Sequence, residues 1–202
     1  MALLDQGGTC GLSSEETEGP YYFDVDSIRS DIREDRPGTT LTLGLRVRDA
    51  ECNPVPDSVV EIWHCDAGGE YSGFESASAS GGRAGGRAGG GVRSDDGTYL
   101  RGAQVADAKG IVQFTTVYPG WYRGRTVHIH LKVHVDTQTV LTSQLFFDDD
   151  LNDAVFATSP YDEHTGRDTR NDDDSIYDDS GRLTTQENGD GYLAVINLGI
   201  DT

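Results

Sequence analysis

Alternating apolar and polar positions are the main pattern in this chain, and the alternation is strictest over residues 128–135. Side chains on a β-strand point to opposite faces in turn, so this pattern predicts a strand with one polar and one apolar face. The polar face carries His128, His130, Lys132 and His134, and the apolar face carries Ile129, Leu131, Val133 and Val135.

Several other segments alternate in the same way or form short apolar runs between turn residues. We expect 40–48 and 58–64 to pair like a hairpin across a turn at 49–57 that contains Pro54 and Pro56. No segment has the spacing of a convincing amphipathic helix. The sequence therefore predicts an all-β fold, an antiparallel β-sandwich with long loops and little helix. The segments predicted to be strands are 40–48, 58–64, 111–117, 128–135, 139–147 and 191–199, and 98–102 is predicted to be ordered.

The length of 202 residues is enough for one domain with a real core and short for two, so we expect residues 1–202 to form a single domain. Residues 1–36 are predicted to be an extended N-terminal arm that wraps the domain, with a partly ordered terminus as the alternative. Residues 75–97 are predicted to be a flexible insertion, because 76–91 contain only Ser, Ala, Gly and Arg. The region 148–182 is predicted to be an irregular acidic loop region.

The chain is strongly acidic, with a net charge of −19 at pH 7. Acidic residues concentrate in 148–181, which holds twelve Asp and Glu but two Arg. So much negative charge argues against nucleic acid as a partner. We interpret the acidic segment as a solvated, loop-rich face rather than as an adaptation to salt. No apolar run approaches the ~18 residues needed to cross a bilayer, and no signal peptide opens the chain, so no membrane partner is expected.

The three cysteines, Cys10, Cys52 and Cys65, form no Cys-x-x-Cys pair. This spacing argues against a structural zinc site. One disulfide and one free thiol would suit an exported protein. Because Cys52 and Cys65 flank one predicted strand at its two ends, Cys10 with Cys52 is the pairing to test first.

Two histidines and two tyrosines are candidates for a metal site. His128 and His130 share the polar face of one predicted strand, about 7 Å apart along the chain, so both can reach one metal ion. Two hydrogen-bonded polar histidines are the alternative. Tyr71 and Tyr122 both lie on glycine-bearing loops next to strand ends, where sites on a rigid scaffold are usually built. For a lone tyrosine, half-buried packing is the alternative.

Longer motifs resemble the intradiol ring-cleaving dioxygenases of catechols, protocatechuate and hydroxyquinol, and most of all the short single-domain exported branch of that family. The resemblance covers nearly the whole chain, although the insertion at 76–91 departs from the family pattern and leaves the shape of the loop after Tyr71 open. The most specific motif is Pro119-Gly-Trp-Tyr122 followed by Arg125-Thr-Val-His128-Ile-His130. The other motifs are Glu18-Gly-Pro-Tyr-Tyr22, Ser27-Ile-Arg-Ser-Asp-Ile-Arg33, Ile62-Trp-His-Cys-Asp66 with Tyr71-Ser72, and the pocket-like segment Phe156-Ala-Thr158.

The resemblance implies a non-haem ferric ion and assigns roles to six residues. It implies that Tyr122 leaves the metal when substrate binds and takes up one of its protons. It also implies that Arg125 stabilises negative charge that develops on the substrate, with a surface ion pair as the alternative. Gln144 resembles a residue near the oxygen pocket, with an ordinary polar residue of a sheet as the alternative. The implied metal ligands are Tyr71, Tyr122, His128 and His130.

The resemblance further implies that a small catecholic substrate and O₂ are the partners. The ring would be cleaved between its two hydroxyls, with both atoms of O₂ incorporated, to give a cis,cis-muconate-type diacid. We expect an extracellular protein, with the cytoplasm as the alternative, and a monomer, because no long helical arm is visible in the sequence.

The remaining histidines do not match the implied ligand positions. We expect His134 to be structural or at the rim of the site, and His164, in the acidic region, to be solvated. Two other functions remain open. One is a non-catalytic β-sandwich binding module of the same fold, and the other is a histidine-rich metalloenzyme of cupin type, for which a downstream Glu and a third His at suitable spacing are missing.

Overall fold

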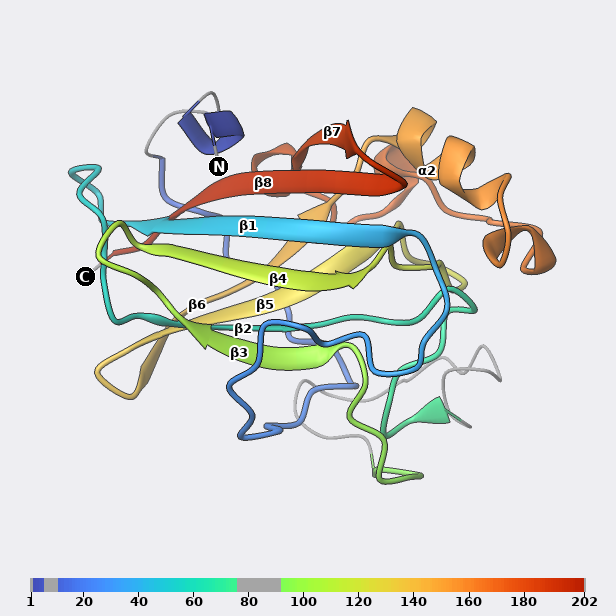
Figure 1. Ribbon diagram of the computed structural model, residues 1–202, viewed down its shortest axis with the longest axis horizontal. Coiled ribbons are helices and arrows are strands. Elements are labelled where there is room, and N and C mark those ends of the chain that lie inside the picture. The colour runs from blue at the N-terminus through green and yellow to red at the C-terminus, as the bar shows by residue number, and fades with distance from the viewer. Residues whose placement is uncertain (1, 6–10, 76–91, 202) are drawn as a thin grey trace.

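Two four-stranded sheets form a sandwich in the computed structural model, which describes residues 2–5, 11–75 and 92–201 (Figure 1). The first sheet has the strand order β4-β1-β8-β7 and the second has the order β3-β2-β5-β6. The predicted all-β sandwich is confirmed. The strands are β1 (Thr40–Arg48), β2 (Val59–Trp63), β3 (Arg101–Val105), β4 (Ile111–Val117), β5 (His128–Val135), β6 (Gln138–Phe146), β7 (Thr184–Asn188) and β8 (Gly191–Gly199).

Strand pairing is mostly antiparallel, and β1 with β8 is the parallel exception. The expected hairpin of β1 and β2 is wrong, because β1 pairs with β4 and β8, whereas β2 pairs with β3 and β5. The connection between β1 and β2 carries the chain from one sheet to the other. Each strand still turns one apolar face to the common core, so alternation alone does not distinguish the two arrangements.

The core lies between the sheets and leaves a polar outer face on the second sheet. Ile129, Leu131 and Val133 on β5 belong to the main hydrophobic cluster together with Leu43 and Leu45 of β1. The alternation predicted for 128–135 is therefore confirmed, with the aliphatic side chains inward. The outer face of the second sheet carries Glu61 and Trp63 of β2, His128, His130 and Lys132 of β5, and Gln144 of β6.

The N-terminal arm crosses this outer face between contacts with the first sheet at Ser13 and Ile32. The Glu16 amide donates to the Thr142 carbonyl at 2.8 Å, and Lys132 Nζ lies 2.7 Å from a carboxylate oxygen of Glu18. Further along, Ile28 forms a β-bridge with Ala103 of β3. The arm thus covers the polar face of the second sheet.

The acidic region contains an α-helix, α2 (Asp149–Phe156), so the expectation of an irregular structure is wrong there. The side chain of Asp148 accepts a hydrogen bond from the Asp150 amide and caps the helix, and acidic residues in a first turn are favoured by the helix dipole. In the described ranges no helix has the length and apolar character needed to cross a bilayer. The short 3-10 helices are Ala2–Asp5, Tyr161–Glu163, Asn171–Asp173 and Asp179–Gly181.

Two of the three cysteines, Cys52 and Cys65, lie in the described residues, and they differ in oxidation state. Cys52 is disulfide-bonded, and Cys65 is a buried free thiol whose Sγ lies 3.5 Å from the Gly120 carbonyl oxygen. Cys10, the expected partner of Cys52, and the insertion at 76–91 lie outside the described residues.

A buried histidine, His64, follows β2. Its Nδ1–H donates to the Cys65 carbonyl at 2.7 Å, and its Nε2 accepts from the Thr116 hydroxyl at 2.8 Å. Burial lowers the pKa of His64 from 6.5 to about 4. The ring is therefore neutral in the folded protein at neutral pH.

Acidification should destabilise the protein through His64. Between pH 6.5 and about 4 the unfolded chain binds a proton at this ring and the folded protein does not, so the free energy of unfolding falls as pH falls through this window. The loss at this residue amounts to about 3 kcal/mol. Urea unfolding of the wild type and His64→Gln at pH 7 and near pH 4.5 should show a smaller fall for the variant, and an equal fall would contradict the assignment.

Candidate metal centre

Four side chains converge on the outer face of the second sheet. Two of them, His128 and His130, come from β5, Tyr122 comes from the loop before β5, and Tyr71 comes from the loop after β2. Nε2 of His128 lies 3.1 Å from the Tyr122 hydroxyl, 3.1 Å from Nε2 of His130 and 3.4 Å from the Tyr71 hydroxyl. The structure therefore brings together all four residues that the sequence indicates as metal ligands.

Close packing of two loops positions the tyrosines. The Gly120 amide donates to the Asp66 carbonyl at 3.0 Å, which joins the loop of Tyr122 to the loop of Tyr71. A Cβ at Gly120 would lie 2.5 Å from the carbonyl oxygens of Asp66 and Ala67, so only glycine allows this approach.

Neighbouring groups fix the orientation of both imidazoles. Nδ1–H of His128 donates to the Thr126 carbonyl at 2.7 Å, so its Nε2 carries the lone pair and points toward the other three side chains. His130 stacks on Trp63, with ring centroids 5.0 Å apart and an interplanar angle of 2°. Gly19 of the arm covers His130, because a Cβ there would lie 3.2 Å from the ring.

Burial favours the neutral form of all four side chains in the metal-free protein. It raises the pKa of Tyr71 well above its usual range and also raises the pKa of Tyr122, although the positive charge of Arg125 opposes the second shift. Burial likewise lowers the pKa of His128 and of His130 well below the usual value. Neutral imidazoles can bind a metal directly, whereas each phenol must first lose its proton, so metal binding releases protons.

The arrangement fits a non-haem ferric ion. Two donor atoms bound to one first-row ion at about 2.0–2.1 Å lie roughly 2.9–3.6 Å apart when they are adjacent ligands, and the observed separations are 3.1–3.4 Å. Phenolate oxygens are hard anionic donors that favour Fe(III), and imidazole suits iron. Elsewhere in the described residues no group of three His, Cys, Asp or Glu is placed to hold a metal, so the structure offers no support for a cupin-type site.

Arg125 is part of a buried hydrogen-bonded chain beside the ligands. Its Nε donates to an Asp174 carboxylate oxygen at 2.8 Å, and its terminal nitrogen donates to Gln144 Oε1 at 2.5 Å. Gln144 in turn donates to the Thr17 carbonyl at 2.9 Å and lies opposite His130 in the β5–β6 pair. The side chain of Arg125 is only 15% exposed, so the alternative of a surface ion pair does not hold.

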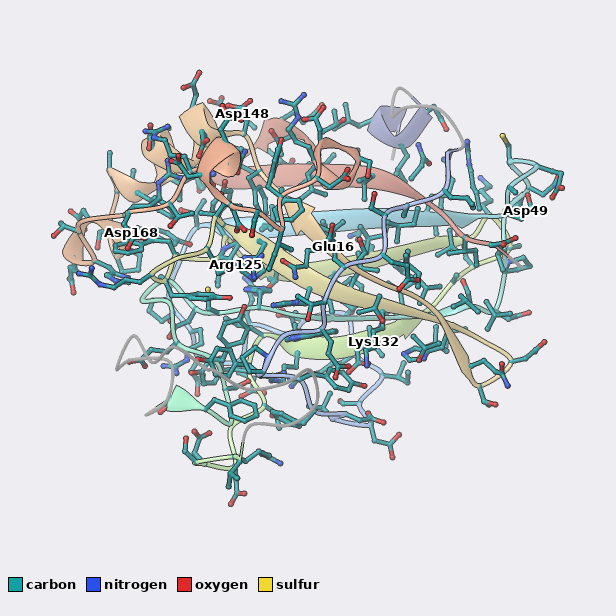
Figure 2. The ribbon with its side chains drawn as sticks, turned by 180° about the vertical axis from the view of Figure 1, so that it is seen from behind. Glu16, Asp49, Arg125, Lys132, Asp148 and Asp168 are labelled. Atoms are coloured by element: carbon teal, nitrogen blue, oxygen red, sulfur yellow. The ribbon has the colours of Figure 1, made fainter. Side chains whose placement is uncertain are left out.

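The arm places a carboxylate near Arg125. Figure 2 shows Glu16 close to Arg125 on the outer face of the second sheet. Burial raises the pKa of Glu16, the negative charge of Asp178 raises it further, and Arg125 lowers it. Two acidic residues, Asp174 and Glu16, therefore act on the guanidinium of Arg125.

Two residues at the site carried no role in the sequence analysis. Asp174 is one of twelve acidic residues in its region, so nothing in its local sequence distinguishes it. Trp63 appeared only within a motif, but it lies directly opposite His130 in the β2–β5 pair. The strand register would have identified Trp63, whereas Asp174 depends on how a long loop folds back.

The other histidines lie apart from the four ligands. His134 has its ring 3.1 Å from Thr139 and 3.6 Å from Glu61, which agrees with the expected structural or rim role. The expectation of a solvated His164 is wrong, because its ring stacks on Trp121 with centroids 4.1 Å apart.

Two aromatic residues of the motifs belong to the core. Tyr118 is fully buried, packs on Phe147 with ring centroids 4.5 Å apart and donates to Asn152, as expected for a packing residue. Phe156, expected in a pocket segment, instead packs against the core and Tyr161. Its position on α2 explains the difference, because α2 lies against the sandwich core.

Comparisons with known proteins agree with this geometry. A family model described as "Dioxygenase" matches residues 17–170. The intradiol ring-cleavage dioxygenase from Tetranychus urticae is 33% identical, with a TM-score of 0.86 and 95% of each chain covered. The dioxygenase domain of a dioxygenase carbohydrate-binding protein fusion from Streptomyces sp. SirexAA-E is 26% identical, with a TM-score of 0.69 and coverage of 95% of this chain and 99% of that domain.

Curated relatives are longer than this chain. Chlorocatechol 1,2-dioxygenase from Rhodococcus opacus is 29% identical over 168 residues, which are 71% of this chain and 59% of the relative. Across this and four catechol 1,2-dioxygenases, the match spans between 44% and 59% of the relative's length. The family match, the shared sandwich and the two similar structures together show that the chain belongs to the intradiol ring-cleaving dioxygenase family.

Proposed function

We propose that this protein is a non-haem Fe(III)-dependent intradiol dioxygenase that cleaves small catecholic rings between the two hydroxyls. Both atoms of O₂ enter the product, a cis,cis-muconate-type diacid. The observation that carries the proposal is the convergence of Tyr71, Tyr122, His128 and His130 within hydrogen-bonding distance of one point.

Bound iron would act as a Lewis acid toward the two catechol oxygens. His128 and His130 hold their positions because both lie on β5 and their rings are fixed by Thr126 and Trp63. Such support keeps imidazole ligands in one orientation. The two histidines are therefore the fixed part of the ligand set.

The two tyrosines differ in how deeply they are buried. Tyr71 is fully buried and packs on Tyr21 with ring centroids 4.8 Å apart, whereas Tyr122 is only partly buried. Tyr122 would be the tyrosine with room to move when substrate binds, and its phenolate oxygen would accept a proton from the incoming catechol. It thereby acts as a general base.

Arg125 supplies positive charge where the substrate becomes more negative. Asp174 and Gln144 hold its guanidinium, so the charge is in place before the reaction. A preorganised donor in a water-poor site stabilises developing charge without further reorganisation. Gln144 acts by positioning Arg125 beside the ligands.

Iron-loaded protein should be burgundy and should consume O₂ when it is given catechol, protocatechuate or hydroxyquinol. The colour arises because a tyrosinate bound to Fe(III) donates charge to the metal. Visible spectra and oxygen uptake across the three substrates test the proposal, and product absorbance distinguishes ring opening between the hydroxyls from opening beside them. A colourless protein with full iron occupancy would refute it.

We further propose that the protein acts outside the cell. The disulfide at Cys52 supports this location, because disulfides persist mainly in oxidising compartments. Finding only reduced thiols in protein isolated from its native source would count against export.

A further inference from the structure

Arg101, at the start of β3, is a buried cation that is not hydrogen-bonded to a carboxylate in the described part of the chain. Its side chain is 1% exposed. Nε donates to the Ser72 hydroxyl at 2.8 Å, one terminal nitrogen donates to the Ser72 carbonyl at 2.9 Å, and the other terminal nitrogen has no hydrogen-bond partner. No ion pair joins Arg101 to a carboxylate in the part of the chain that the structure describes. Burying a charge without a counterion costs free energy, so we expect an anion close to Arg101 in the metal-loaded protein.

Among the acidic groups around Arg101, Tyr71 has the largest charge effect on the guanidinium, ahead of the carboxylate of Glu61. Its guanidinium carbon lies 4.2 Å from the ring centre of Phe23, 5.9 Å from that of Phe74 and 6.0 Å from that of Tyr71. Phenylalanine rings carry no charge, whereas the Tyr71 oxygen becomes negative when it binds a metal. The missing anion therefore corresponds to metal-bound Tyr71.

The strand register ties Arg101 to the metal centre. Arg101 lies opposite Trp63, Trp63 lies opposite His130, and His130 lies opposite Gln144. These four residues form one row across the second sheet. A sheet holds such a row at fixed spacing, so Arg101 and the ligands keep their relative positions.

The other cation of the site is balanced differently. Arg125 forms a 2.8 Å ion pair with Asp174, so it has a carboxylate partner within hydrogen-bonding distance, which Arg101 lacks. We infer that Arg101, which forms no ion pair with a carboxylate in the described residues, provides the countercharge for metal-bound Tyr71. The inference rests on the proposed function, because it requires a metal at the four ligands.

Two neutral variants, Arg101→Gln and Arg101→Met, test this role. Both remove the charge, and Arg101→Gln keeps a donor for Ser72. Ferric ion affinity, measured by competition with a chelator, should fall roughly tenfold to hundredfold in both. Arg101→Lys should remain within about threefold of wild type because it keeps the charge. The matched control is Arg93→Met, since Arg93 is exposed and lies 4.0 Å from the centre of the same Phe23 ring.

Spectra and melting temperatures separate this electrostatic role from a structural one. Charge transfer moves an electron from Tyr71 toward the metal and away from Arg101, so loss of the positive charge should shift the visible band to longer wavelength in the neutral variants. The gain in melting temperature on iron loading should also shrink. The inference would be overturned if the neutral variants kept the ferric ion affinity, the visible band and the gain in melting temperature of the wild type. It would also be overturned if Arg101→Lys lost as much ferric ion affinity as the neutral variants. A wild type that binds no ferric ion would instead refute the proposed function.

Discussion

Replacing His128 by alanine should abolish ferric ion binding and ring cleavage together. Its Nε2 is the central atom of the cluster, within 3.1–3.4 Å of donor atoms from the other three side chains. The loss should exceed the roughly 10- to 100-fold effect typical when only a residue that supports a ligand is changed. Iron content after loading and oxygen uptake with catechol measure the two effects.

His134→Ala is the matched control for this substitution. His134 lies on the same strand and its ring contacts Glu61 and Thr139, not the four ligands. This variant should bind iron and turn over substrate like the wild type. Equal losses in the two variants, or full iron content in His128→Ala, would show that the cluster is not the metal site.

Replacing Arg125 by glutamine should lower kcat by about 10²- to 10³-fold while iron content stays at the wild-type level. The reason is that the positive charge of Arg125 stabilises the negative charge that develops on the substrate, whereas Arg125 does not bind the metal. Asp174 and Gln144 hold the guanidinium in place beside the ligands, so the substitution removes a positioned positive charge. Steady-state kinetics with catechol and iron analysis of the same samples test this prediction.

Arg123→Gln is the matched control, because it removes a positive charge from the same loop at an exposed position. The side chain of Arg123 is 74% exposed and lies 3.9 Å from Asp168 at the surface. We expect its kcat to match the wild type. If Arg125→Gln raised KM with kcat unchanged, Arg125 would contribute to binding and not to the reaction.

Much of the fold was predictable because burial imposes a period of two on strands. The core strands alternate clearly, whereas β7 (Thr184–Asn188) consists of polar residues at the edge of its sheet and was missed. It is a strand because its backbone pairs with β8, which its own pattern does not reveal. The helix at Asp149–Phe156 was not predicted, because the helix-capping Asp148 is followed directly by Asp149 and Asp150 and so does not stand out in the sequence.

The candidate site was predictable in part. The alternation in β5 placed His128 and His130 on one face, and a family motif indicated Tyr71 and Tyr122. Asp174 could not be predicted, because its contact with Arg125 joins residues 49 positions apart through a loop with many similar acids. Such long-range contacts depend on tertiary packing and leave no local pattern.

The most direct test of the proposed activity is the isotopic composition of the product that iron-loaded protein forms from catechol under oxygen-18. An intradiol dioxygenase should give a cis,cis-muconate-type diacid in which both atoms of O₂ are incorporated. Mass spectrometry measures the label, and absorbance identifies the site of ring opening. An unlabelled product, or one opened beside the two hydroxyls, would show that the protein is not an intradiol dioxygenase.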